Sequence, residues 1–162
     1  MVQVLSIIFG FLSALILISL DIPLIGSFLG KYLFRYLNGG LQKLKSFEEV
    51  PAKGPNQSVI KENDKSFYTL LAVFRSYFPD IFINRHQKII GVVCQSALAL
   101  APKNEGMLNP VCLWFEGESK LVSVCSLNEL RVVIRDYKQR ILNRLGLFFL
   151  VLSLVLQVLY LN

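Results

Sequence analysis

Charged side chains are missing from both ends of this 162-residue sequence. None occurs from Val2 to Leu20 or from Leu145 to Asn162, although the chain holds 17 Lys and Arg and 11 Asp and Glu. All of the basic residues and all but one of the acidic residues therefore lie in the central part. Hydrophobic residues make up 54% of the chain, a high share for a soluble protein. These features argue against an ordinary water-soluble domain at either end.

Histidine is nearly absent, and the motifs of common catalytic and cofactor sites are missing. His86 is the only histidine and lies in a polar stretch that we expect to be a turn. Cys94, Cys112 and Cys125 match no zinc or CxxC spacing, and an iron–sulfur cluster would lack a fourth cysteine. There is no GxGxxG, Walker A or GxSxG motif. We therefore expect no catalytic residue, metal or cofactor; an enzyme that pairs a cysteine with His86 is the least favoured hypothesis.

The two charge-free ends are long enough to cross a membrane as helices. A hydrocarbon core of about 30 Å takes roughly 17–25 helical residues. Val2–Leu20 offers 19 residues and Leu145–Leu161 offers 17, and neither run contains a turn signal that would divide it into strands. We predict one transmembrane helix at 1–20 and a second at 145–162. A cleaved signal peptide is the alternative for the first, but no Lys or Arg precedes its apolar run.

The basic residues beside the predicted spans indicate the orientation. They lie only on the inner flanks, and positive charge marks the cytoplasmic side of a span. We expect the middle of the chain on the cytoplasmic side of a bacterial inner membrane, or on the matrix or stromal side of an organelle inner membrane, with both termini opposite. Three cysteines kept as thiols fit such a reducing compartment. The basic residues expected to face lipid headgroups or a partner are Lys31, Arg35, Lys43, Lys45, Lys138, Arg140 and Arg144.

Residues 21–46 have the pattern of a basic amphipathic helix next to the membrane. Apolar residues recur at helical spacing from Ile25 to Leu44, with basic and amide side chains on the other face. Such a helix either lies on lipid headgroups or packs on a partner's membrane helix. Gly39 and Gly40 are expected to loosen or break it. Residues 47–65 are predicted to be a linker, because they hold two prolines and little apolar periodicity.

Residues 66–144 are predicted to form a small α+β soluble domain of four or five short strands covered by two helices. Ser66 is the expected N-cap of a helix that ends before Pro79. A hairpin is expected around the turn 117–119. The runs predicted as strands are Ile81–Asn84, Lys88–Cys94, Ser96–Ala101, Val111–Glu116 and Leu121–Cys125. The stretch 89–101 is apolar but too short for a third span, so a strand pair or a core helix is favoured over a span. The sequence leaves open whether it is a strand pair, a helix or a re-entrant segment.

A capping box precedes the last predicted helix. In Ser126-Leu127-Asn128-Glu129, the hydroxyl of Ser126 accepts from the amide of Glu129, whose carboxylate reaches back. Neither Pro nor Gly occurs from Ser126 to Leu145. We therefore expect one long helix that runs from the soluble domain into the second span, with a bend near Gly146. The stretch 111–134 (VCLWFEGESKLVSVCSLNELRVVI) resembles the end of a pleckstrin-homology-like barrel, and we carry no residue role over from it.

The expected function is that of a non-catalytic accessory subunit or assembly scaffold of a membrane complex. Its partners would be a bilayer with anionic headgroups and other membrane-protein subunits or further copies of the chain. The alternative is a membrane-anchored sensor or effector whose basic domain binds an anionic ligand and signals to an oligomeric membrane region. Nucleic acid is not an expected partner, since much of the positive charge lies beside the spans. If the spans pair, Gly10, Ser13 and Ala14 would allow close approach.

Overall fold

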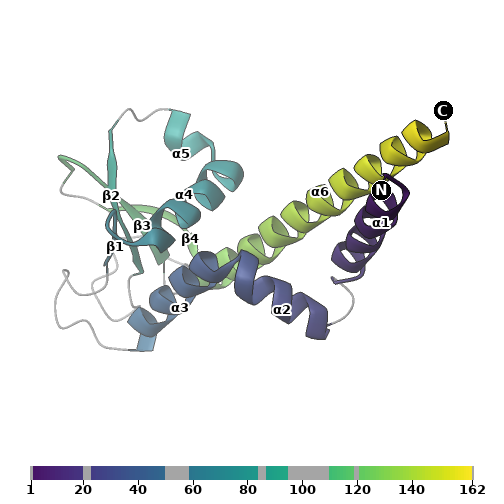
Figure 1. Ribbon diagram of the computed structural model, residues 1–162. Coiled ribbons are helices and arrows are strands. Elements are labelled where there is room, and N and C mark those ends of the chain that lie inside the picture. The colour runs from purple at the N-terminus through teal and green to yellow at the C-terminus, as the bar shows by residue number, and fades with distance from the viewer. Residues whose placement is uncertain are drawn as a thin grey trace. The chain divides into compact units, whose positions relative to one another are not determined.

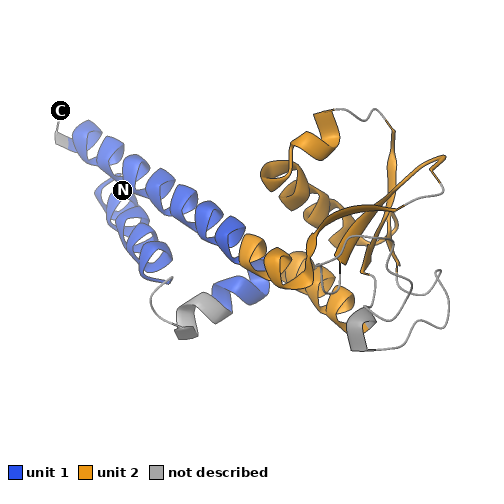
Figure 2. Ribbon diagram, turned by 180° about the vertical axis from the view of Figure 1, so that it is seen from behind, with its two compact units in different colours: residues 1–34, 135–162 blue, residues 35–134 orange. Residues whose placement is uncertain are grey.

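The computed structural model describes residues 2–19, 23–49, 59–83, 87–94, 110–118 and 121–161. These residues form helices and a four-stranded antiparallel sheet, which confirms the mixed α+β class (Figure 1). The chain divides into two units, and each is described by itself (Figure 2). Unit 1 joins residues 1–34 with residues 135–162, and unit 2 consists of residues 35–134.

Unit 1 contains apolar helices from both ends of the sequence. Helix α1 covers Val2–Ile18, and helix α6 covers Leu127–Leu161. Among the described residues, one helical segment is long and apolar enough to cross a membrane, and it is Leu127–Tyr160 of α6. Helix α1 is apolar but shorter. The 35 residues of α6 extend about 52 Å at a rise of about 1.5 Å per residue. One crossing of a hydrocarbon core of about 30 Å would therefore leave close to half of α6 outside.

The start of α6 follows the sequence prediction. Ser126 directly precedes the helix, and its Oγ accepts a hydrogen bond of 3.1 Å from the backbone N–H of Glu129. This bond is the first half of the predicted capping box, and it satisfies one of the amides that a helix leaves open at its N-terminus. The helix then continues through Gly146, the position where a bend was expected.

The predicted amphipathic helix over 21–46 is two helices. Helix α2 covers Pro23–Leu33 and helix α3 covers Arg35–Glu49, with a turn at Phe34 between them. The two helices belong to different units. Gly39 and Gly40 lie inside α3, so the prediction that they break the helix was wrong.

Helices α2 and α3 differ in what they bury. Phe28 and Tyr32 of α2 are 62% and 66% exposed, and their rings contact each other with centroids 4.9 Å apart. In α3, Leu37 and Leu44 are buried. Inside unit 2 the helix contacts α4 (Lys65–Tyr77), β1 (Val59–Lys61) and β2 (Ile89–Cys94). The apolar face of α3 thus packs within the α+β unit rather than on lipid.

The sheet of unit 2 has the strand order β1-β2-β3-β4, and every neighbouring pair is antiparallel. The strands are β1 Val59–Lys61, β2 Ile89–Cys94, β3 Pro110–Phe115 and β4 Val122–Ser126. The predicted strand at 88–94 and the predicted hairpin are confirmed. Strand β1 lies in the segment predicted as a linker. The predicted strand at 96–101 lies outside the described residues.

The prediction of a strand at 81–84 was wrong for residues 81–83, because Asp80–Ile83 forms the short helix α5. Aromatic and branched side chains suggested a strand there. Pro79 has no N–H to lose in a first helical turn, and Asp80 is favourable at a helix N-terminus. The backbone N–H of Phe82 and that of Ile83 both donate to the carbonyl oxygen of Pro79, at 2.9 Å and 3.1 Å.

Helix α4, Lys65–Tyr77, packs its aromatic face in the core as predicted. Phe67 and Phe74 are buried, and α4 contacts β1. Its N-cap is Asp64 and not Ser66, because the Asp64 carboxylate accepts from the backbone N–H of Ser66 at 2.9 Å. The sheet is covered by α3 in addition to α4, which the sequence had not indicated.

A close approach between helices explains one of the two glycines of α3. A Cβ built on Gly40 would lie 2.9 Å from Leu70 Cδ1 and 3.1 Å from Ser66 Cβ, both on α4. The same atom on Gly39 would lie 3.6 Å from Ser66 Oγ, an ordinary contact. Glycine at position 40 therefore lets the backbone of α3 approach α4 more closely than any side chain would permit.

Candidate functional site

Within unit 1, α1 and the C-terminal part of α6 are joined by reciprocal serine hydrogen bonds. Ser6 Oγ donates to the carbonyl oxygen of Ser153 at 3.2 Å, and Ser153 Oγ donates to the carbonyl oxygen of Ser6 at 2.8 Å. Farther along, Ser13 Oγ donates to the carbonyl oxygen of Gly146 at 2.8 Å. Because the residue number rises along α1 as it falls along α6, the two helices are antiparallel.

Glycines bring the two helices close enough for these bonds. A Cβ on Gly10 would lie 3.2 Å from Ser153 Oγ, and a Cβ on Gly146 would lie 2.8 Å from two carbons of Leu17. Small residues play this role where apolar helices pack tightly. Gly10 and Ser13 thus lie at the contact as the sequence indicated, whereas Ala14 is exposed.

The outer surfaces of both helices are apolar. Phe11 and Phe148 are 64% and 61% exposed, and no Asp, Glu, Lys, Arg or His occurs within 2–19 or 145–161. Water would solvate such a continuous surface poorly, so it requires lipid or another apolar surface. Further exposed large side chains here are Val4, Leu5, Ile7, Ile8, Leu12, Leu147, Val151, Leu154, Val155, Val158 and Leu159.

Unit 2 contains an open groove of about 900 Å³ between α3 and the turn from β1 to α4. Four basic residues line it. Arg35 and Lys43 come from α3, and Lys61 and Lys65 come from β1 and the first turn of α4. We call this surface the basic groove. Arg35 and Lys43 were predicted to face lipid headgroups or a partner, whereas Lys61 and Lys65 were not singled out.

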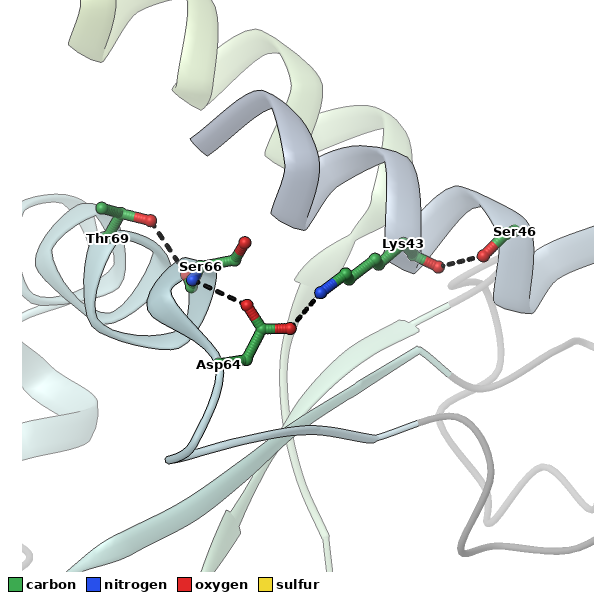
Figure 3. A network of polar contacts seen from close by, with 5 residues as sticks. All are labelled: Lys43, Ser46, Asp64, Ser66 and Thr69. Atoms are coloured by element: carbon green, nitrogen blue, oxygen red, sulfur yellow. Dashed lines mark hydrogen bonds and ion pairs between the residues drawn. The ribbon is translucent and has the colours of Figure 1, made fainter. Parts of the chain in front are cut away.

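The acidic residue among those lining the basic groove, Asp64, already has two partners. Figure 3 shows its carboxylate between the ammonium of Lys43, with which it forms an ion pair, and the backbone N–H of Ser66. The hydrogen bond from Lys43 lowers the pKa of Asp64 below its usual value, and the bond from Ser66 acts in the same direction. Asp64 therefore neutralises Lys43, whereas none of the other three cations of the groove forms an ion pair with a described residue.

The remaining predicted basic residues divide between the two units. Within unit 1, Lys138 Nζ lies 5.9 Å from the ring centroid of Phe34, and Arg140 pairs with Asp136 at 3.0 Å one helical turn away. Lys31 and Arg144 are exposed on α2 and α6, and Lys45 is exposed on α3 of unit 2, outside the groove lining.

The three cysteines are buried thiols of the sheet. Cys94, Cys112 and Cys125 lie on β2, β3 and β4, and none of the three forms a disulfide. Burial raises the pKa of Cys112 to about 11 and that of Cys125 to about 12, so neither is activated as a nucleophile. The described residues include no group of three or more His, Cys, Asp and Glu that could hold a metal ion. His86 lies outside the described residues.

A second hollow of unit 2, about 500 Å³ in volume, has an apolar floor that includes Phe67, Phe82 and Phe115. Glu62 lines it and pairs with Lys88 at 2.8 Å. The hydrogen bond from Lys88 lowers the pKa of Glu62. Glu62 is thus directed away from the basic groove, although it follows directly after Lys61.

No family model, curated protein or solved structure matches this chain.

Proposed function

We propose that the chain is a non-catalytic accessory or assembly subunit of a membrane complex, anchored by α1 and by the C-terminal part of α6. The apolar outer surface of these paired helices is the observation on which the proposal rests. Three serine hydroxyls form hydrogen bonds between the two helices, while Phe11 and Phe148 are exposed. Such a pair of helices is suited to a lipid environment.

The proposed topology has two crossings, with unit 2 on the cytoplasmic or matrix side. The 17 residues of α1 extend about 26 Å, which is close to the hydrocarbon thickness of about 30 Å. The basic residues all lie between Lys31 and Arg144, which favours retention of the central part on the positive side.

Labelling with a membrane-impermeant maleimide tests this topology. Gln3→Cys and Ser46→Cys each place a thiol on an exposed helical position, one at the start of α1 and one on α3. In sealed membrane vesicles the two variants should react from opposite sides. The native cysteines provide a low background because they are buried. Reaction of both variants from the same side would exclude two crossings.

Membership of a complex requires a separate test. The full chain, extracted in a mild detergent at its native expression level, should elute well above the mass of one 18.4 kDa chain and its micelle. A photo-crosslinking residue at Phe11 or Phe148 should then form a discrete protein adduct, whereas one at the exposed Tyr68 of unit 2 serves as the control. A stable lone monomer that forms only lipid adducts would refute an accessory role.

A further inference from the structure

We propose that the basic groove of unit 2 binds a phosphate group that carries about two negative charges, as in a pyrophosphate, a phosphomonoester or a lipid headgroup of that kind. This goes beyond a scaffold role, since such a site would exist whatever complex the chain belongs to. The shared chemistry of these ligands is a compact anion with at least three oxygen acceptors.

The basic groove carries positive charge that no described residue neutralises through an ion pair. Arg35 and Lys61 are exposed, and neither makes an ion pair or hydrogen bond among the described residues. Lys65 Nζ lies 5.6 Å from the centroid of the Tyr36 ring, a contact that leaves its charge in place. Three cations on two walls of one groove repel each other, and an anion between them would relieve that repulsion.

Contacts between α3 and α4 hold the two walls of the basic groove together. The close contact of Gly40 with α4 sets α3 beside the turn that carries Lys61 and Lys65. Asp64 caps α4 and pairs with Lys43 of α3, so the same carboxylate connects the two walls (Figure 3). The groove is therefore built by core packing, by a helix cap and by the ion pair between Asp64 and Lys43.

The charge and the number of cations in the groove favour phosphate over a single carboxylate. A carboxylate has two oxygens and one charge, which cannot satisfy three cations that come from two walls. A phosphate group has more oxygens and more charge, and the planar fork of an arginine matches two of them at once. The groove is open and holds about 900 Å³, so the anion can remain attached to a larger molecule or to a membrane surface.

Titration of the full chain in detergent with sodium pyrophosphate, followed by calorimetry, tests the site. Saturable binding is expected. Lys61→Gln should weaken it about tenfold, the loss expected when one charge-assisted contact is removed. Lys45→Gln removes the same charge from an exposed position of α3 outside the groove and should change the affinity less than twofold. Absence of saturable binding, or equal losses in the two variants, would overturn the proposal in this arm.

A second arm distinguishes the source of the phosphate. The chain is placed in nanodiscs of phosphatidylcholine alone or with added phosphatidic acid, and acetylation of Lys61 and Lys65 is measured by mass spectrometry. Protection by phosphatidic acid without pyrophosphate identifies a headgroup ligand, whereas protection that requires pyrophosphate identifies a soluble one. If neither anion protects these lysines, the groove is not a phosphate site. The result does not depend on whether the chain elutes as a complex, so it can fail independently of the accessory role.

Discussion

Two adjacent glycines of α3 provide a matched test of how this helix packs in unit 2. Replacement of glycine by alanine inside a helix gains up to about 1 kcal/mol of stability, because alanine loses less backbone entropy. Gly39→Ala should show this gain, since its new Cβ would meet Ser66 Oγ at an ordinary 3.6 Å. Gly40→Ala gains the same propensity, but its Cβ would lie 2.9 Å from Leu70 Cδ1, and Leu70 is fully buried.

The size of the difference follows from the cost of overpacking, which is about 1–3 kcal/mol when a methyl group is forced into a close-packed core. Gly40→Ala should therefore be less stable than Gly39→Ala by about that amount. For a unit of this size, 1 kcal/mol corresponds to a Tm change of about 4–8 °C. Fluorescence of Trp114, the only tryptophan and a residue of β3, reports the unfolding of unit 2 in detergent. If both variants raise Tm equally, the described packing of α3 on α4 is incorrect.

Three further predictions concern other contacts. Ser6→Cys combined with Ser153→Cys should form a disulfide under mild oxidation, because the two native Oγ atoms are 3.4 Å apart; a gel without reductant that shows no shifted band would contradict the helix pairing. Asp64→Ala should cost about 0.5–2 kcal/mol, as for other lost N-caps, and Asp64→Asn should cost less because its amide oxygen can still accept. Since the pKa of Asp64 is lowered in the folded chain, its ion pair stabilises above the carboxyl's ordinary pKa and is lost as pH falls through the lower value, so this part of the pH dependence of Tm should be absent in Asp64→Asn. The thiols of Cys112 and Cys125, whose pKa values burial raises to about 11 and 12, should react with maleimide near neutral pH only after denaturation; mass spectrometry of the intact chain would reveal any earlier labelling.

Local sequence signals predicted the elements whose residues carry their own boundaries. The long helix α6 has a capping serine at Ser126 and no early breaker, and the hairpin β3–β4 has Gly117 with a positive φ of 80° in its turn. Each depends on residues close to one another in the chain. Such features can be read from one sequence because tertiary contacts are not needed to explain them.

Elements that exist because of distant partners were missed. Strand β1 is only three residues long, and its pairing of Ile60 with Val92 of β2 stabilises it. Helix α3 was predicted to lie on a membrane or on a partner, because its apolar stripe shows that it packs on something but not on what. Leu44 is fully buried in unit 2 instead. The same apolar stripe suits a helix on a membrane and a helix in the core of unit 2, because both environments are apolar.

The sequence indicated two of the four basic residues that line the basic groove. Arg35 and Lys43 were singled out by their position after the first apolar run, but Lys61 and Lys65 were not, because they lie in a segment predicted as a linker. Pairing of β1 with β2 and the cap at Asp64 bring them to the same groove. A search for basic residues four apart, such as Lys61 and Lys65, beside a helix cap would have found them.

The serine contact between α1 and α6 has a consequence for biosynthesis. Ser6 and Ser153 are separated by 147 positions in the chain, and Ser13 and Gly146 by 133. Helix α1 leaves the ribosome long before its partner helix has been translated. Newly made α1 is therefore unpaired while the intervening unit is synthesised and folds. Its glycine-and-serine surface then needs temporary shelter, from lipid, an insertase or a chaperone. A message truncated before the codon for Gly146 would produce a chain in which α1 never acquires its partner helix.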